Sequence, residues 1–117
     1  MNSKPLLWVM VLALFSCGKN STQNQAPLII EGNELTIAFG SCAHSYDTLT
    51  IFTAIESHKP AIWVWLGDII YGDSHDMAVL KEKYDKQKNK PEYQKLMANS
   101  KVIGIWDDHD YGVNDGG

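Results

Sequence analysis

The chain has 117 residues, 44% of them hydrophobic and 21% charged, which is the composition of one folded globular domain and excludes a disordered or collagen-like protein. Its formal net charge is −4, and its 10 basic residues are all lysines. It therefore has no basic stripe that could follow a phosphate backbone, which excludes nucleic acid as the main partner. Two cysteines, Cys17 and Cys42, are too few for the disulfide framework of a small secreted domain.

Residues 1–27 predict export and a tether. The apolar run over residues 5–15 is too short to span a bilayer, so residues 1–17 are interpreted as a signal peptide. Residues 14–18, Leu-Phe-Ser-Cys-Gly, resemble a bacterial lipoprotein box, in which a lipid is attached to Cys17; a plain secretory signal is the alternative. Residues 18–27 have the polar composition of a tether. We expect an exported protein of the cell envelope or periplasm, held at a membrane through Cys17.

Residues 28–117 predict an α/β domain with parallel strands. Leu35 to Phe39 alternate apolar and small or polar side chains and form a strand that stops at Gly40. A helix follows, capped by Ser45 or Asp47 and ending before Pro60, with an apolar face made by Leu49, Ile51, Phe52 and Ile55. Residues 61–66 are continuously apolar and predict a strand buried on both faces. Such a β-α-β unit is almost always a right-handed crossover between parallel strands.

The second half of the chain predicts two more helices and another strand. Residues 76–89 carry Met77, Leu80 and Tyr84 at helical spacing, and their many lysines indicate a solvated face. Pro91 is expected to begin a helix over residues 92–98. Residues 102–106 are apolar and predict a third strand, and the short run at 28–30 could add an edge strand.

Each of these strands is followed by side chains that can bind a metal. Cys42 follows the first strand, Asp68 and Tyr71 the second, and residues 107–110, Asp-Asp-His-Asp, the third. Adjacent strands are about 4.8 Å apart, so the three strand ends should lie within roughly 10 Å of one another. Carboxylates this close repel one another unless a cation neutralises them, and residues 102–117 contain no lysine or arginine. We therefore expect a metal site at the carboxyl edge of the sheet.

The donor types favour a divalent or trivalent transition metal, with calcium as an alternative on an oxygen-rich side. For residues 61–73 alone, a second interpretation fits equally well, in which Asp68 caps the next helix and Tyr71 packs in the core. An Asp-rich calcium loop over residues 107–115 fits poorly, because Gly112 stands where a ligand is needed.

Three segments, in this order, resemble the first signature blocks of the alkaline phosphatase D (PhoD-like) metallophosphoesterases. They are Phe-Gly-Ser-Cys at 39–42, Leu-Gly-Asp-Ile-Ile-Tyr-Gly at 66–72 and Trp-Asp-Asp-His-Asp-Tyr-Gly at 106–112. The middle block is also similar to a purple acid phosphatase motif. The resemblance runs from about Leu35 to the end of the chain. It implies that residues 28–117 are the amino-terminal part of a layered metallophosphoesterase fold, incomplete because family members are longer and draw further ligands from a second half.

The resemblance also implies a set of metal ligands. Cys42, Asp68 and Tyr71 would hold one metal, commonly iron, and Asp68 would bridge to a second metal. Asp108 occupies the position of an asparagine ligand in the wider group, and Asn114 falls where the PhoD-like pattern has an amide ligand. The cofactors expected are two or more metal ions, iron and calcium by resemblance, with zinc or manganese as alternatives.

Two residues are expected to act on the substrate side of this site. His109 is the candidate for stabilising phosphoryl oxygens or protonating the leaving alkoxide, and Asp110 is expected to orient its ring. The predicted activity is metal-dependent hydrolysis of phosphate mono- or diesters. The alternative is an inactive or metal-binding exported lipoprotein fragment.

Overall fold

A computed structural model describes residues 26–28, 30, 32–44 and 49–116. The predicted signal peptide and lipoprotein box, and most of the predicted tether, lie outside the described residues. Within the described residues, no helix has both the length and the apolar character needed to cross a membrane.

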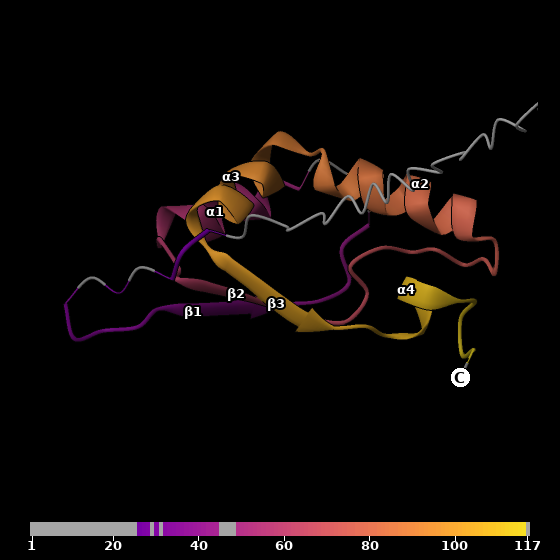
Figure 1. Cartoon of the computed structure of the whole chain (residues 1–117), viewed down its shortest axis with the longest axis horizontal. Helices are drawn as coiled ribbons and strands as arrows, with labels where there is room; N and C mark the ends of the chain where they lie inside the picture. The colour runs from indigo at the N-terminus through magenta and orange to yellow at the C-terminus, as the bar shows by residue number, and fades with distance from the viewer. Residues whose placement is uncertain (1–25, 29, 31, 45–48, 117) are drawn as a thin grey trace, which may run out of the picture.

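The described chain forms an α/β domain with a three-stranded parallel sheet of order β1-β2-β3 (Figure 1). The strands are β1 (Ile37–Gly40), β2 (Ile62–Leu66) and β3 (Lys101–Ile105). The helices are α1 (Ile51–Ser57), α2 (Met77–Lys88), α3 (Pro91–Asn99) and the single turn α4 (Asp108–Tyr111). The predicted parallel α/β architecture is thus confirmed, while a metallophosphoesterase fold in particular stays a prediction.

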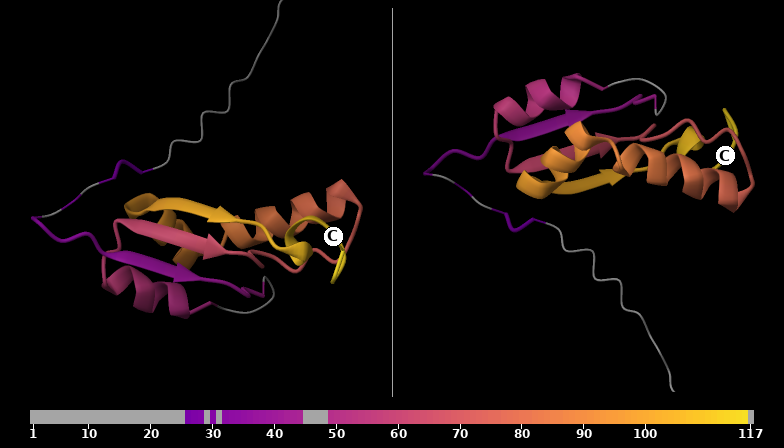
Figure 2. Two further views of the ribbon diagram at one scale, coloured as in Figure 1. Left: turned by 90° about the horizontal axis from the view of Figure 1, so that it is seen from below. Right: turned by 90° about the horizontal axis from the view of Figure 1, so that it is seen from above.

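The helices α1 and α3 cover the same face of the sheet. In the strand order β1-β2-β3, the connections from β1 to β2 and from β2 to β3 both move across the sheet in the same direction. Because both crossovers have the same handedness, their helices lie on the same side of the sheet. Figure 1 shows α1 and α3 on the same side of the sheet, and in Figure 2 (left), from below, the strands face the viewer with no helix across them. The topology therefore gives the sheet one covered face.

The core lies between the sheet and these two helices. Phe52 of α1 is its centre, and its ring centroid lies 5.9 Å from those of Trp63 and Trp65 and 5.0 Å from that of Tyr93. The indole N–H of Trp65 donates to the hydroxyl of Tyr93 at 2.8 Å, so these two buried polar groups form a hydrogen bond with each other. Leu96 of α3 closes the cluster and is fully buried. Aromatic pairs of this kind contribute about 0.5–1.5 kcal/mol each beyond the area that they bury.

The opposite face of the sheet exposes apolar side chains. Phe39 is 69% exposed and Ile105 is 65% exposed, and both alternate along their strands with the side chains that face the helices. In β2, Trp63 and Trp65 are buried but Leu66 is exposed. The prediction that this strand is buried on both faces is therefore wrong within the described residues, because α1 and α3 both pack against the tryptophan side.

Some local predictions also differ from the structure. The helix α1 begins at Ile51 after Thr50, whose side chain makes no capping hydrogen bond, and the predicted caps Ser45 and Asp47 lie outside the described residues. Ile51 and Met77 are exposed although their spacing placed them on buried faces. The buried residue of α1 is the neighbouring Phe52, and the buried residues of α2 are Leu80 and Gln87. The described residues of the run at 28–30 form no strand.

Candidate metal centre

The ends of the three strands meet at the carboxyl edge of the sheet. The backbone N–H of Ala43, after β1, donates to the carbonyl of Asp68, after β2, at 2.9 Å. The segment after β2 is joined in turn to α4, which follows β3, because the N–H of Gly72 donates to the carbonyl of His109 at 2.8 Å. The predicted convergence of residues 42, 68 and 107–110 is therefore present.

A sharp turn aims Asp68 at this edge. Gly67 has φ +98°, and a Cβ there would lie 2.6 Å from Cβ of Asp107, so only glycine lets the ends of β2 and β3 approach so closely. Asp68 itself has φ +51°, in the left-handed region that side chains other than Asn and Asp rarely adopt. Its side chain makes none of the described capping bonds: α2 is capped by Asp76, which accepts from the N–H of Ala78. The interpretation of Asp68 as a helix cap is therefore wrong.

One carboxylate oxygen of Asp68 faces a thiol and a phenol. Cys42 Sγ and the hydroxyl of Tyr71 each donate to Asp68 Oδ2 at 3.4 Å. Cys42 is a free, exposed cysteine. Burial, followed by the neighbouring Cys42 and Asp68, raises the pKa of Tyr71 above its ordinary value. A phenolate is therefore disfavoured in this cluster unless a cation binds beside it.

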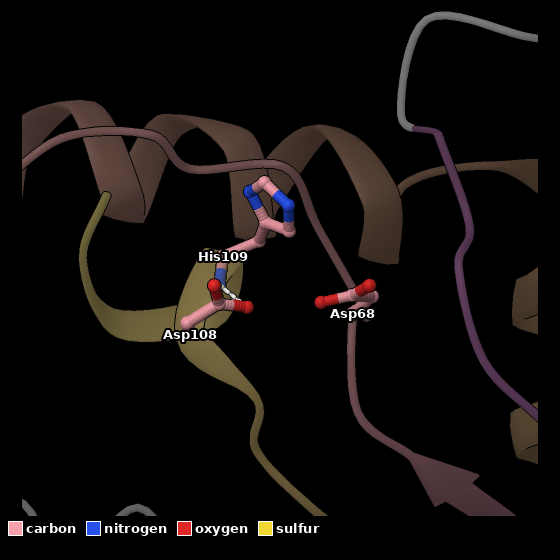
Figure 3. Close-up of side chains that lie close together, drawn as sticks. All are labelled: Asp68, Asp108 and His109. Atoms are coloured by element: carbon pink, nitrogen blue, oxygen red, sulfur yellow. Dashed lines mark hydrogen bonds between the residues drawn. The ribbon is translucent and has the colours of Figure 1, made fainter. Parts of the chain in front are cut away.

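The other side of Asp68 faces the segment after β3. Asp68, Asp108 and His109 each offer a ligand atom, and these atoms all lie within 4.8 Å of one another (Figure 3). Asp68 Oδ1 is buried and has no hydrogen-bond partner among the described residues. A buried carboxylate oxygen is ordinarily satisfied, so this atom fits a place for a cation. These three residues could hold a metal ion, and Asp68 belongs both to this group and to the cluster with Cys42 and Tyr71.

Asp108 is held in place by backbone donors. Its Oδ1 accepts the N–H of His109 at 2.9 Å, and its Oδ2 accepts the N–H of Asp115. The N–H of Asp115, together with that of His109, holds the pKa of Asp108 below its ordinary value, so the carboxylate form is favoured. The amide of Asn114, a predicted ligand, donates to the carboxylate of Asp115 at 2.6 Å. The described bonds of Asn114 therefore connect it to its neighbour and not to the group of Asp68.

Asp110 is a structural residue, contrary to its predicted role. It is 2% exposed, and its carboxylate accepts the N–H of Ile70 and the N–H of Asp107, each at 3.0 Å. The second bond is half of a capping box, in which the side chain of Asp107 caps α4. Tyr84 of α2 also donates to Asp110, at 3.3 Å. This carboxylate joins the ends of β2 and β3 to α2 and does not orient the ring of His109.

The partner of the His109 ring is Asp73. Nδ1 of His109 lies 2.6 Å from Oδ1 of Asp73, and this carboxylate raises the pKa of His109 above its ordinary value. The ring of Tyr71 lies between two imidazoles, 3.9 Å from the ring of His44 and 4.5 Å from that of His109. The sequence analysis did not identify Asp73. The only indication in the sequence was its position, two residues after Tyr71 in a glycine-containing loop.

Backbone strain gathers at this edge of the sheet. Within the described residues, five non-glycine residues have positive φ, and Cys42, Asp68 and Asp73 are three of them. Such conformations cost of order 1–3 kcal/mol each and persist where the surrounding structure fixes them, commonly at functional sites. The strained positions are the same residues that bring a thiol and two carboxylates to the site.

A separate hollow of about 500 Å³ lies at the opposite, amino edge of the sheet. Its lining includes Thr36, His58, Ala61 and Ser100, all near the amino ends of the strands, and none of the metal-binding group. His58 therefore lies at the edge of the sheet opposite to the metal-binding group.

The chain matches no protein-family model, no curated protein and no solved structure. The candidate site therefore rests on its own geometry and on the resemblance of its three sequence blocks.

Proposed function

We propose that this chain belongs to a metal-dependent phosphoesterase of the PhoD-like type, which hydrolyses phosphate mono- or diesters. The observation that carries the proposal is the position of Asp68, whose carboxylate is shared by two donor groups. One group contains Cys42 and Tyr71, and the other contains Asp108 and His109. Two donor groups that share one carboxylate suit a pair of neighbouring cations.

The donor chemistry indicates which cations each group would hold. A thiolate, a phenolate and a carboxylate suit a transition metal such as iron, and zinc is an alternative. The group with Asp108 and His109 contains two carboxylates and one imidazole, which suits zinc, manganese or a second iron, while calcium would need more oxygen donors. Bound cations would supply a water of lowered pKa and screen the charge of the phosphate.

The residues of the chain would do the remaining work. Asp68 and Asp108 would bind the cations in carboxylate form, and backbone N–H groups favour that form at Asp108. His109 keeps one ring nitrogen beyond the one bonded to Asp73, and this nitrogen would contact a cation in the neutral ring or, when the ring is protonated, give a proton to the leaving alkoxide. The stacked rings of His44 and Tyr71 would form a wall beside the substrate.

The test is hydrolysis of para-nitrophenyl phosphate and bis(para-nitrophenyl) phosphate by the complete product of the gene, after addition of iron with calcium, zinc or manganese. We expect metal-dependent turnover that is abolished in Asp68→Asn. Asp76→Asn is the matched control, because it removes the same charge from a nearby exposed residue and leaves asparagine as an effective helix cap. Unchanged turnover in Asp68→Asn would refute the assignment.

A second candidate is an inactive, metal-binding exported lipoprotein. The group of Asp68, Asp108 and His109 favours it, because three donors within 4.8 Å of one another can hold a cation without any hydrolysis. Stoichiometric bound metal without turnover of either ester would support this candidate over the first. In both cases we propose export and attachment to a membrane through Cys17, on the grounds of the sequence.

A further inference from the structure

We propose that Asp73 is a positioning residue that fixes the tautomer of His109, holding the proton on Nδ1 so that Nε2 presents its lone pair to the site. This inference deepens the proposed function and rests on it for its purpose, but the tautomer itself is a property of the chain alone. The observation behind it is the 2.6 Å contact between His109 Nδ1 and Asp73 Oδ1.

The chemistry of imidazole gives this contact its meaning. A neutral imidazole carries one proton, and the hydrogen bond made by one ring nitrogen decides which nitrogen is protonated. The carboxylate of Asp73 can only accept, so the nitrogen that faces it must be the donor. Histidine that binds a metal or moves a proton ordinarily has such a carboxylate or carbonyl behind it, and loss of that partner typically costs 10–100-fold in metal affinity or activity.

The backbone around Asp73 is fixed on both sides, which makes the contact specific. The N–H of Gly72 donates to the carbonyl of His109 at 2.8 Å, and the N–H of Ser74 donates to the carbonyl of Gly112 at 3.1 Å. A Cβ at Gly72 would lie 2.7 Å from that carbonyl of His109, so a side chain there would push the two segments apart. Lys83 of α2 donates to the carbonyls of Tyr71 and Gly72, at 2.6 and 2.9 Å.

Asp73 also adopts a conformation that needs such support. Its φ is +49°, in the left-handed region, and the two backbone bonds beside it hold this conformation. The carboxylate is 47% exposed while the imidazole is 16% exposed. Asp73 is therefore the more exposed partner of the pair, and the imidazole of His109 is the more buried one.

The decisive experiment reads the tautomer directly, in the metal-free chain and without substrate. Long-range ¹H–¹⁵N correlation spectra of the ¹⁵N-labelled protein, at a pH where the imidazole is neutral, distinguish a protonated from an unprotonated ring nitrogen. We expect His109 to carry its proton on Nδ1. A wild-type spectrum with the proton on Nε2 would overturn the inference, whatever any variant does.

Two substitutions separate the hydrogen bond from the backbone. Asp73→Gly removes the acceptor and is compatible with positive φ, so we expect the proton to redistribute to Nε2. Asp73→Asn keeps a carbonyl oxygen that can accept, so we expect it to retain the Nδ1 proton. Asp76→Asn serves as the charge-matched control and should leave the spectrum unchanged. An unaltered tautomer in Asp73→Gly would show that Asp73 does not set it.

Calorimetric titration with Zn²⁺ alone tests whether the tautomer of His109 affects metal affinity at the site. Affinity should fall about 10–100-fold in Asp73→Gly and be largely rescued in Asp73→Asn. Equal affinity in the wild type and Asp73→Gly would refute the positioning role. Failure of the wild type to bind metal would count against the proposed function, while the metal-free spectra would still decide whether Asp73 fixes the ring.

Discussion

The most direct test of the metal centre is the substitution Asp68→Asn, read through stability. Asparagine has the shape of aspartate and tolerates the φ of +51° at this position, so the backbone turn should survive. The substitution removes the one negative charge that both donor groups share, next to Asp108. In the absence of metal we therefore expect the variant to unfold at the same temperature as the wild type or higher, because repulsion between the two carboxylates is gone.

The expected size of the effect follows from binding linkage. A metal that binds only the folded state, at a free concentration of 100 times its Kd, raises the free energy of unfolding by about 2.7 kcal/mol. For a domain of roughly 60–100 residues, 1 kcal/mol shifts Tm by about 4–8 °C, so the wild type should gain about 10–20 °C. If loss of the Asp68 charge weakens binding about 100-fold, the same metal concentration equals the new Kd and the stabilisation drops to about 0.4 kcal/mol.

The measurement is thermal unfolding followed by circular dichroism, with chelator and with Zn²⁺ or Mn²⁺. Asp76→Asn should keep the full metal-dependent gain, because Asp76 caps α2 and is not one of the group. A shift of Tm in Asp68→Asn as large as in the wild type would refute the placement of the metal.

Three further outcomes follow from the packing. Gln87 is fully buried, and neither polar atom of its side-chain amide has a hydrogen-bond partner among the described residues. Gln87→Leu should therefore raise the free energy of unfolding by about 1–3 kcal/mol in denaturant titrations. A lower free energy of unfolding would mean that a buried water satisfies the amide. Phe52→Ala should lower the free energy of unfolding by about 3–5 kcal/mol, because Phe52 is 1% exposed. Phe39→Thr should lower it by less than about 0.5 kcal/mol, because Phe39 is 69% exposed. Equal losses would mean that the outer face of the sheet is covered. Burial, and then the neighbouring Asp110, raises the pKa of Tyr84 above its ordinary value of about 10. Below pH 10 this phenol is neutral in both states; above it the unfolded chain releases a proton that the folded protein retains, so stability falls with rising pH. The fall should be smaller in Tyr84→Phe, followed by tyrosinate absorbance and circular dichroism, and an identical alkaline profile would contradict the reasoning.

The parallel sheet could be predicted because its signals are local. An alternating strand, an amphipathic helix and an apolar run over residues 61–66 define a β-α-β unit, and the handedness of such units is nearly fixed. The spatial order of the strands determines which face of the sheet the helices cover, and the composition of the segments does not reveal that order. The two-sided burial expected for β2 failed for that reason.

The sequence predicted those site residues whose positions follow from the ends of the strands. Cys42, Asp68, Tyr71, Asp108 and His109 come together because parallel strands deliver their carboxyl ends to one edge. The partner of the His109 ring was assigned wrongly, because adjacency in sequence was taken for adjacency in space. Successive residues of a helical turn point in different directions, so Asp110 turns inward to Ile70 while His109 faces Asp73 on another segment.

The buried carboxylate of Asp110 has a consequence for how mutational data on this protein should be interpreted. It accepts hydrogen bonds from two other segments, at Ile70 after β2 and Tyr84 of α2, and from Asp107 at the start of its own helix α4. These contacts hold the ligand-bearing loops in position. Replacement of Asp110 would disturb these loops and so lower any activity of the site, although the residue is not among the proposed metal ligands. An activity screen alone would therefore classify Asp110 as a catalytic residue. A structure of the variant, which shows whether the loops have moved, would identify its role as structural.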